Sequence, residues 1–230
     1  MKVAAIFTAV AAFQQRPGEN CGLNSVTSLS LDPTTKVIKG EEASLGMFPW
    51  QAEFRSCQLR GCSICGATLV SDRWLITAGH CSTSSTVASK SSVRLGSTKF
   101  GQGGKEYTLE TIIRHPGWTG NLLTANDVSV IKTVDQIQFS DYVSPLCLPK
   151  EDICLETGSE IWLSGFGKTA DDSEVSSSLQ YTDLKLISNA ECKKYFGVVA
   201  RNTGSIHFSF DFFTGFICRY MFRKTFLQHF

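Results

Sequence analysis

The stretch "DRWLITAGHC", residues 72–81, decides the fold class, because it ends an apolar, strand-like run with a histidine beside a cysteine. Short runs of this kind recur along the chain, and clusters of Gly, Pro, Asn or Ser separate them. This pattern predicts antiparallel strands in a sandwich or barrel rather than helices. The runs are "PWQAEFR" (49–55), "ATLVSDRWLITA" (67–78), "SVRLG" (92–96), "YTLETIIRH" (107–115), "DVSVIKTV" (127–134), "EIWLSGFG" (160–167) and "LQYTDLKLIS" (179–188).

Composition narrows the classes of protein. The chain has 230 residues, of which 42% are hydrophobic and 19% charged, which suits one large or two small cores. A formal net charge of +1 gives no electrostatic reason to expect a nucleic acid or an anionic membrane as partner. Nine cysteines are typical of an oxidising compartment. The sequence has no cysteine–histidine cluster at ligand spacing and no glycine-rich phosphate loop, so we expect neither a metal nor a cofactor.

The N-terminus favours export. A short positive start, Met1-Lys2, precedes the apolar run Val3–Phe13, in which Ala9-Val10-Ala11 supplies the small residues that a signal peptidase prefers. We predict a signal peptide over residues 1–12, with a buried N-terminal helix as the alternative. The polar residues 13–36 are interpreted as a linker or propeptide.

Two features accompany His80. Cys65 lies 16 residues before Cys81, and a disulfide between them would staple a hairpin and fix the loop that carries His80. Closing a loop of that length is worth about 3 kcal/mol in the chain-entropy account. Asp127 follows His80 by 47 residues and begins an apolar strand, where a carboxylate can be shielded from water while it bonds an imidazole N–H. His80 and Asp127 are therefore the candidate catalytic residues.

Further motifs occur in a fixed order, and together they resemble the secreted serine endopeptidases of the chymotrypsin and trypsin family. This resemblance implies an all-β, chymotrypsin-like fold of two antiparallel barrels with the catalytic cleft between them. The resemblance covers roughly residues 21–196. It implies an incomplete domain at residues 37–200, in which the first barrel spans about 37–139 and the second is incomplete. The motifs are "KVIKG" (36–40), "FPWQ" (48–51), "LITAGHC" (75–81), "HPGW" (115–118), "VSPLCLP" (143–149) and "LSGFG" (163–167).

The resemblance implies a role for each site residue. His80 would be the general base and Asp127 the carboxylate that orients its imidazole, with a serine as nucleophile. A trypsin-like protease would cleave after Lys36 and free Val37 as a new amino terminus, although Lys39 stands where the family has glycine. The implied substrates are proteins or peptides. The implied protein is a secreted, extracellular monomer.

The resemblance also implies disulfides. Cys65 would pair with Cys81, and Cys21 with Cys147, which would keep a cleaved propeptide attached. Cys57 and Cys62 are close enough in one loop to pair with each other. Cys154 and Cys192 lack the partners that the family would provide.

The nucleophile motif is not in the sequence. Family spacing places Gly-Asp-Ser-Gly-Gly near residue 220, where this chain reads "FICRYMFRK" (216–224). The backbone N–H groups of that motif bind the oxyanion, and each such donor is worth about 2.7–4 kcal/mol. We therefore expect no peptide hydrolysis from the chain as written.

The last thirty residues differ from the rest. Residues 201–230 hold eight of the 16 phenylalanines, with no sustained period of strand or helix. We interpret this tail as sequence not selected to fold with the domain, with a membrane-associating or partner-binding segment as the alternative. A helix is predicted before it, at Ser188–Phe196.

Two functional hypotheses remain open. The favoured one is a partial or misassembled translation of an active secreted protease. The other is a non-catalytic homologue that binds or regulates partners.

Overall fold

The structure is a computed structural model that describes residues 8–11, 21–22, 41–120, 126–148, 156–167, 175–188, 191 and 216–218. Two short 3-10 helices accompany the strands, η1 at Gly79–Cys81 and η2 at Ala88–Lys90. The strands are β1 (Thr8–Ala11), β2 (Glu41–Glu42), β3 (Gln51–Gln58), β4 (Gly61–Leu69), β5 (Trp74–Thr77), β6 (Ser92–Leu95), β7 (Lys105–Arg114), β8 (Ser129–Thr133), β9 (Glu160–Gly165), β10 (Gln180–Ile187) and β11 (Phe216–Cys218).

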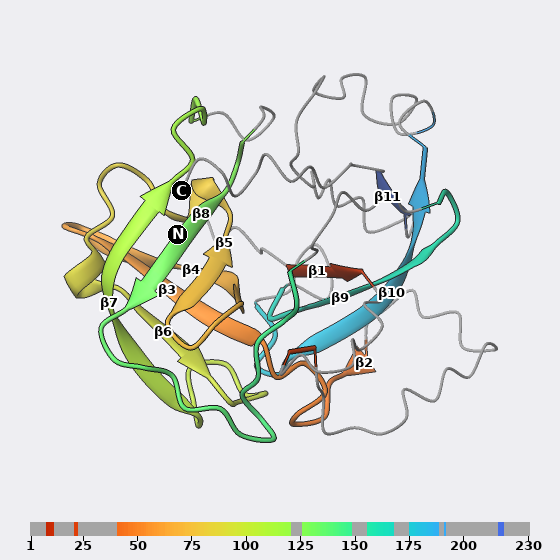
Figure 1. Ribbon diagram of the computed structural model, residues 1–230, viewed down its shortest axis with the longest axis horizontal. Coiled ribbons are helices and arrows are strands. Elements are labelled where there is room, and N and C mark those ends of the chain that lie inside the picture. The colour runs from red at the N-terminus through yellow and green to blue at the C-terminus, as the bar shows by residue number, and fades with distance from the viewer. Residues whose placement is uncertain are drawn as a thin grey trace.

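Six strands close into an antiparallel barrel, in the order β3-β4-β5-β8-β7-β6 (Figure 1). In a closed barrel, inward-facing residues alternate with outward-facing ones along each strand. In β7, Tyr107 and Leu109 are buried, whereas Glu106, Thr108 and Glu110 are exposed. The barrel interior includes Phe54, Leu75 and Ile131, each 0% exposed, and each stabilises the fold by roughly 1.5–3 kcal/mol. The closed first barrel agrees with the sequence prediction.

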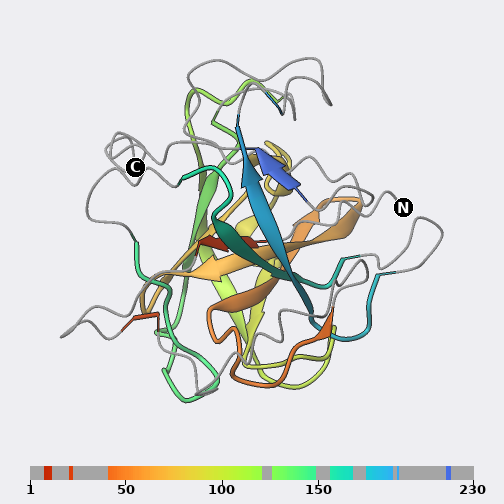
Figure 2. The same cartoon turned by 90° about the vertical axis from the view of Figure 1, so that its right-hand side faces the viewer.

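The remaining strands form an open sheet beside the barrel, in the order β1-β9-β10-β11 with β2 also paired to β10 (Figure 2). β9 and β10 are antiparallel over six residue pairs, from Gln180 opposite Gly165 to Lys185 opposite Glu160. In the described residues this second sheet does not close. The all-β class, with one complete barrel and a second sheet, is confirmed.

Aromatic side chains join the two halves. The ring of Phe48 lies 5.7 Å from that of Tyr181 and 6.4 Å from that of Trp50, and Tyr181 in turn lies 5.8 Å from Trp162. Next to this cluster, the hydroxyl of Ser164 in β9 donates a buried hydrogen bond of 2.9 Å to Oε1 of Gln51 in β3. These contacts fix the second sheet against the barrel.

Three disulfides are present in the described residues: Cys21–Cys147, Cys57–Cys62 and Cys65–Cys81. They are the three pairings expected from the sequence. The bond between Cys57 and Cys62 spans the two-residue turn that joins β3 to β4. No helix in the described part of the chain is both long enough and apolar enough to span a bilayer.

Some strand boundaries differ from the sequence prediction. β4 begins at Gly61, six residues before the predicted run, because its first half pairs with β3 although it lacks an alternating pattern. Asp127 does not begin a strand: β8 starts at Ser129, and Asn126 before it has a positive φ of 66° that turns the chain into the strand.

Several predictions concern segments that are described only in part. Thr8–Ala11, inside the predicted signal peptide, forms a strand antiparallel to β9. Phe216–Cys218, inside the aromatic tail, pairs in parallel with β10. Glu191 is helical and its backbone N–H donates to Oγ of Ser188, while the rest of the predicted helix lies outside the described residues. Lys36 and Val37 also lie outside them.

Candidate active site

The pairing of β5 with β8 brings the two candidate catalytic residues together. These strands are antiparallel, and their last pair is Thr77 opposite Ser129. The chain beyond the end of β5 therefore lies beside the chain that leads into β8. His80 follows β5 by three residues and Asp127 precedes β8 by two, so both lie just past the end of the ladder.

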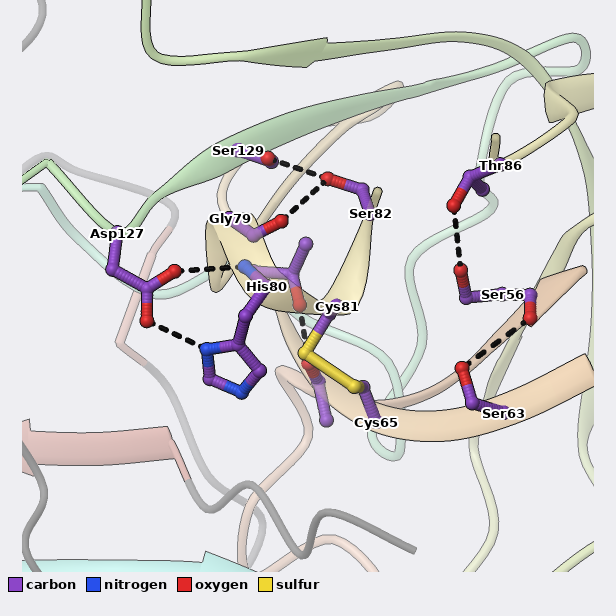
Figure 3. Close-up of a disulfide and its surroundings, with 12 residues drawn as sticks. Ser56, Ser63, Cys65, Gly79, His80, Cys81, Ser82, Thr86, Asp127 and Ser129 are labelled. Carbon is purple, nitrogen blue, oxygen red and sulfur yellow. Dashed lines mark hydrogen bonds and ion pairs between the residues drawn. A yellow bond between two sulfur atoms is a disulfide. The ribbon is translucent and has the colours of Figure 1, made fainter. Parts of the chain in front are cut away.

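Asp127 binds His80 at two points (Figure 3). Its Oδ1 accepts a 2.7 Å hydrogen bond from the backbone N–H of His80, and its Oδ2 lies 2.6 Å from Nδ1 of the same residue. The side chain of Asp127 is 11% exposed and that of His80 is 21% exposed. A carboxylate in this place makes Nδ1 the protonated nitrogen of a neutral ring, which leaves Nε2 as the acceptor. The pair can therefore act as a general base through Nε2.

Gly79 gives the carboxylate room. A Cβ on this residue would lie 3.0 Å from Oδ1 of Asp127, 3.0 Å from the backbone N of Val128 and 3.2 Å from Cδ2 of Trp118. Two of these neighbours are closely held, because Asp127 is bonded to His80 and Val128 N–H donates to the carbonyl of Asn126 at 2.8 Å. A side chain at the residue before His80 would therefore require Asp127, Val128 or Trp118 to shift by a few tenths of an ångström.

The loop that carries His80 is anchored to the barrel on its other side. The disulfide Cys65–Cys81 links η1 to β4, and the hydroxyl of Thr77 donates a buried 2.7 Å hydrogen bond to the carbonyl of Gly66 in β4. His80 is thus held from two sides. The disulfide of the next residue, Cys81, links it to β4, and the carboxylate of Asp127 binds it from the segment before β8.

The "HPGW" turn borders the site. Nδ1 of His115 accepts a hydrogen bond from the backbone N–H of Gly117 at 3.1 Å, so this ring takes part in its own turn. The turn brings Trp118 against Gly79, and the guanidinium of Arg114 lies 5.8 Å from the Trp118 ring centre. These contacts make His115 part of the turn that borders the site rather than of the His80–Asp127 pair.

The described residues bring no nucleophile to the pair. Both hydrogen bonds of His80 go to Asp127, and no serine or cysteine of the described ranges hydrogen-bonds its ring. Ser85 bonds Oγ1 of Thr83 instead, at 2.8 Å. His207 and His229 lie outside the described residues. Within the part of the chain that is described, no three His, Cys, Asp or Glu side chains gather as a metal site would require.

Two buried serines near the pair were missed by sequence reasoning. Oγ of Ser82 and Oγ of Ser129 lie 2.6 Å apart, and these residues are 1% and 0% exposed. Neither serine belongs to a motif, and their relation depends on the register of β5 and β8. Gly79 was part of a quoted motif, but its steric role appears only with Asp127 in place.

The shifted pKa values belong to groups away from this pair. Burial, together with a 2.6 Å hydrogen bond to Glu41, raises the pKa of Tyr181 to about 12. The hydrogen bond from Lys99 lowers the pKa of Glu42, and that from Lys132 lowers the pKa of Glu110. The hydrogen bonds of Tyr181 and Glu42 bind the segment after residue 40 to β10 and to the neighbouring loops. They therefore hold the start of the domain in place.

Comparison with known proteins agrees with this geometry. The family model for Trypsin matches residues 37–211. Ovochymase-2 of Mus musculus is 28% identical over 162 residues, which is 69% of this chain and 26% of that protein. Serine proteinase stubble of Drosophila melanogaster is 29% identical over 172 residues, which is 71% of this chain and 22% of that protein. The chain thus spans about a quarter of the length of these two relatives. On the family match, this chain belongs to the trypsin family of serine proteases.

Proposed function

We propose that this chain carries the base half of a secreted serine endopeptidase, with His80 as general base and Asp127 as the residue that orients and stabilises it. The observation that carries the proposal is the two-point contact of Asp127 with the backbone and ring of His80. A carboxylate used only for stability would not need to hold a ring nitrogen in one tautomer. The family match and the similarity to serine proteinase stubble support the same reaction class, the hydrolysis of peptide bonds in proteins.

The same proposal implies that the 230 residues do not hydrolyse peptides by themselves. The sequence contains no Gly-Asp-Ser-Gly-Gly, so neither the nucleophile nor the oxyanion-binding N–H groups are supplied. A base without a nucleophile cannot form an acyl-enzyme. Cleavage after Lys36 by a trypsin-like protease would free Val37, but the aspartate of that motif, which pairs with the new amino terminus in the family, is missing.

The test uses the full chain, cleaved after Lys36. It is incubated with a mixture of broad peptide substrates and, separately, with a serine-reactive phosphonate probe, beside an active trypsin as positive control. We expect neither turnover nor labelling. Robust labelling of this chain would show that one of its other serines is an activated nucleophile, and would overturn the proposal.

Export is part of the proposal. Residues 1–12 act as the signal peptide, so its cleavage removes β1 from the edge of the second sheet. Residues 13–36 act as the propeptide, which the disulfide Cys21–Cys147 ties to the domain 37–200. The protein is then an extracellular monomer without a nucleic acid or membrane partner. N-terminal sequencing of secreted material checks this: a start near Phe13 is expected, and a start at Met1 would contradict it.

The second candidate is a non-catalytic homologue that binds a partner. One observation favours it: the first barrel closes with all six of its strands, so its surface does not depend on the serine motif. Two measurements decide between these candidates: mass spectrometry of secreted, folded protein and the sequencing of transcripts. Peptides from the Phe-rich tail in that material would favour the binding protein, whereas transcripts that continue after Phe196 into a Gly-Asp-Ser-Gly-Gly segment would favour the protease.

A further inference from the structure

A second bridge joins the two segments that carry His80 and Asp127. Ser82 lies two residues after His80, Ser129 lies two residues after Asp127, and their hydroxyl oxygens are 2.6 Å apart (Figure 3). The β5–β8 ladder ends at the pair Thr77 and Ser129. The serine bridge therefore continues the connection between these segments beyond the point where backbone pairing stops.

Burial and hydrogen-bond chemistry assign the donors. Ser82 is 1% exposed and Ser129 is 0% exposed, so bulk solvent does not reach either hydroxyl. Oγ of Ser82 also donates to the carbonyl oxygen of Gly79, at 3.3 Å. A serine hydroxyl has one proton to give. All three groups are satisfied when Ser129 donates to Ser82 and Ser82 donates to Gly79.

This chain of bonds ends on the peptide group that precedes His80. The carbonyl of that peptide belongs to Gly79 and accepts both the backbone N–H of Ser82, at 3.0 Å, and the Ser82 hydroxyl, while its N–H belongs to His80 and donates to Oδ1 of Asp127. The two ends of a trans peptide point in opposite directions. The peptide plane is therefore held on both sides, by a serine bonded to β8 and by the carboxylate that precedes β8.

We propose that Ser82 and Ser129 are positioning residues for the His80–Asp127 base. By fixing the peptide plane at His80, they keep Nδ1 aimed at Oδ2 of Asp127 and hold the ring in the tautomer whose Nε2 accepts a proton. The inference rests on the proposed function, because only that function gives the His80–Asp127 pair a catalytic role. It adds that the pair is pre-organised by the barrel itself, without any group from the serine motif.

The test reads the imidazole directly in the full chain labelled with 15N-histidine. The variants are Ser82→Ala, Ser129→Ala and the double variant. The matched control is Ser56→Ala, because Ser56 is also 1% exposed and its hydroxyl bonds that of Thr86 at 3.2 Å, away from His80 (Figure 3). The readouts are the low-field Nδ1 proton of His80, its exchange with water and the ring 15N shifts.

We expect exchange of the Nδ1 proton to accelerate roughly two- to tenfold in Ser129→Ala and in the double variant, which is the range for the loss of one hydrogen bond. Ser56→Ala should leave exchange unchanged although it too loses stability. The double variant leaves no unpaired buried hydroxyl, so it provides the measurement if a single variant does not fold.

Unchanged exchange and unchanged ring shifts in the double variant, with lowered thermal stability, would assign the serines a purely structural role and overturn the inference. That result would leave the proposed function standing. A wild-type His80 whose Nδ1 proton is absent, or whose signals do not respond to Asp127→Asn, would overturn both.

Discussion

Asp127 accepts two hydrogen bonds from a single residue, one from the backbone N–H of His80 and one at its ring Nδ1, at 2.7 and 2.6 Å. The backbone bond fixes where the carboxylate lies, and the ring bond fixes which nitrogen holds the proton. This arrangement requires both carboxylate oxygens to be acceptors. It is sensitive to any change that replaces one oxygen by a donor.

Asp127→Asn makes that change. The amide NH2 has to face either the His80 N–H or the ring, so one hydrogen bond is lost or the ring switches to the tautomer with the proton on Nε2. We expect the free energy of unfolding to fall by about 1–3 kcal/mol. Urea unfolding measures the loss, and ring 15N shifts report the tautomer.

The matched control is Asp72→Asn, because Asp72 also accepts a side-chain hydrogen bond, from Gln136, but at an exposed place on the barrel. It should leave both the stability and the His80 ring signals nearly unchanged. Equal effects of the two substitutions would contradict a special role for Asp127.

Gly79→Ala tests the space beside the carboxylate. The added methyl would lie 3.0 Å from both Oδ1 of Asp127 and the backbone N of Val128, so these neighbours have to shift by a few tenths of an ångström, which disturbs the contact of the carboxylate with His80. We expect a loss of about 1–3 kcal/mol in the free energy of unfolding, typical of overpacking, and a changed His80 ring spectrum.

Gly101→Ala separates this effect from backbone strain. Gly101 has a positive φ of 66°, and a Cβ there meets no atom within 4 Å. It should cost roughly 1–2 kcal/mol through strain alone and leave the His80 signals in place. A normal His80 spectrum in Gly79→Ala would show that the site can absorb the methyl group.

Part of the first barrel could be predicted from sequence because strands such as β5 and β7 alternate. In β7 the buried Tyr107 and Leu109 fall at every second position, which is the signal that sequence reasoning uses. The first half of β4 could not be found this way. Residues 61–64 are mostly exposed and are held by pairing with β3 and by the disulfide from Cys62, neither of which leaves a periodic trace.

The residues of the site also fall into those that could be predicted from the sequence and those that could not. His80 and Asp127 were expected because they occur in motifs with a known spacing. Ser82 and Ser129 could not be expected, since serines are common and the meeting of these two is decided by the register in which Thr77 faces Ser129. The steric role of Gly79 also depends on a residue 48 positions away in the chain, Asp127.

The disulfides offer a graded test of stability. In the chain-entropy account, the constraint on the unfolded state grows with the length of the closed loop. The separation is 16 residues for Cys65–Cys81 and 5 for Cys57–Cys62. Replacing both cysteines by alanine should therefore cost about 3 kcal/mol for the first bond and about 2 kcal/mol for the second.

Thermal unfolding under non-reducing conditions ranks the two double variants. Only loss of Cys65–Cys81 should also disturb the His80 ring signals, because that bond anchors η1. The reverse order of stabilities would refute the entropic explanation for this barrel.

The last prediction concerns the pH dependence of the bond between Tyr181 and Glu41. Burial raises the pKa of Tyr181 to about 12, and the carboxylate of Glu41, which accepts its hydroxyl at 2.6 Å, adds to this. An unfolded tyrosine has a pKa of about 10. The folded state therefore holds the proton more tightly, so this contribution to stability is complete below about pH 10 and is lost as the pH rises towards 12.

Tyr181→Phe isolates the effect, because it keeps the ring contacts with Phe48 and Trp162 but has no proton to lose. The stability difference between wild type and variant should be constant up to about pH 9 and should shrink above about pH 10. Urea unfolding at a series of pH values measures it, and the difference cancels all other titrating groups. A difference that stays constant up to about pH 12 would mean that Tyr181 titrates alike in both states.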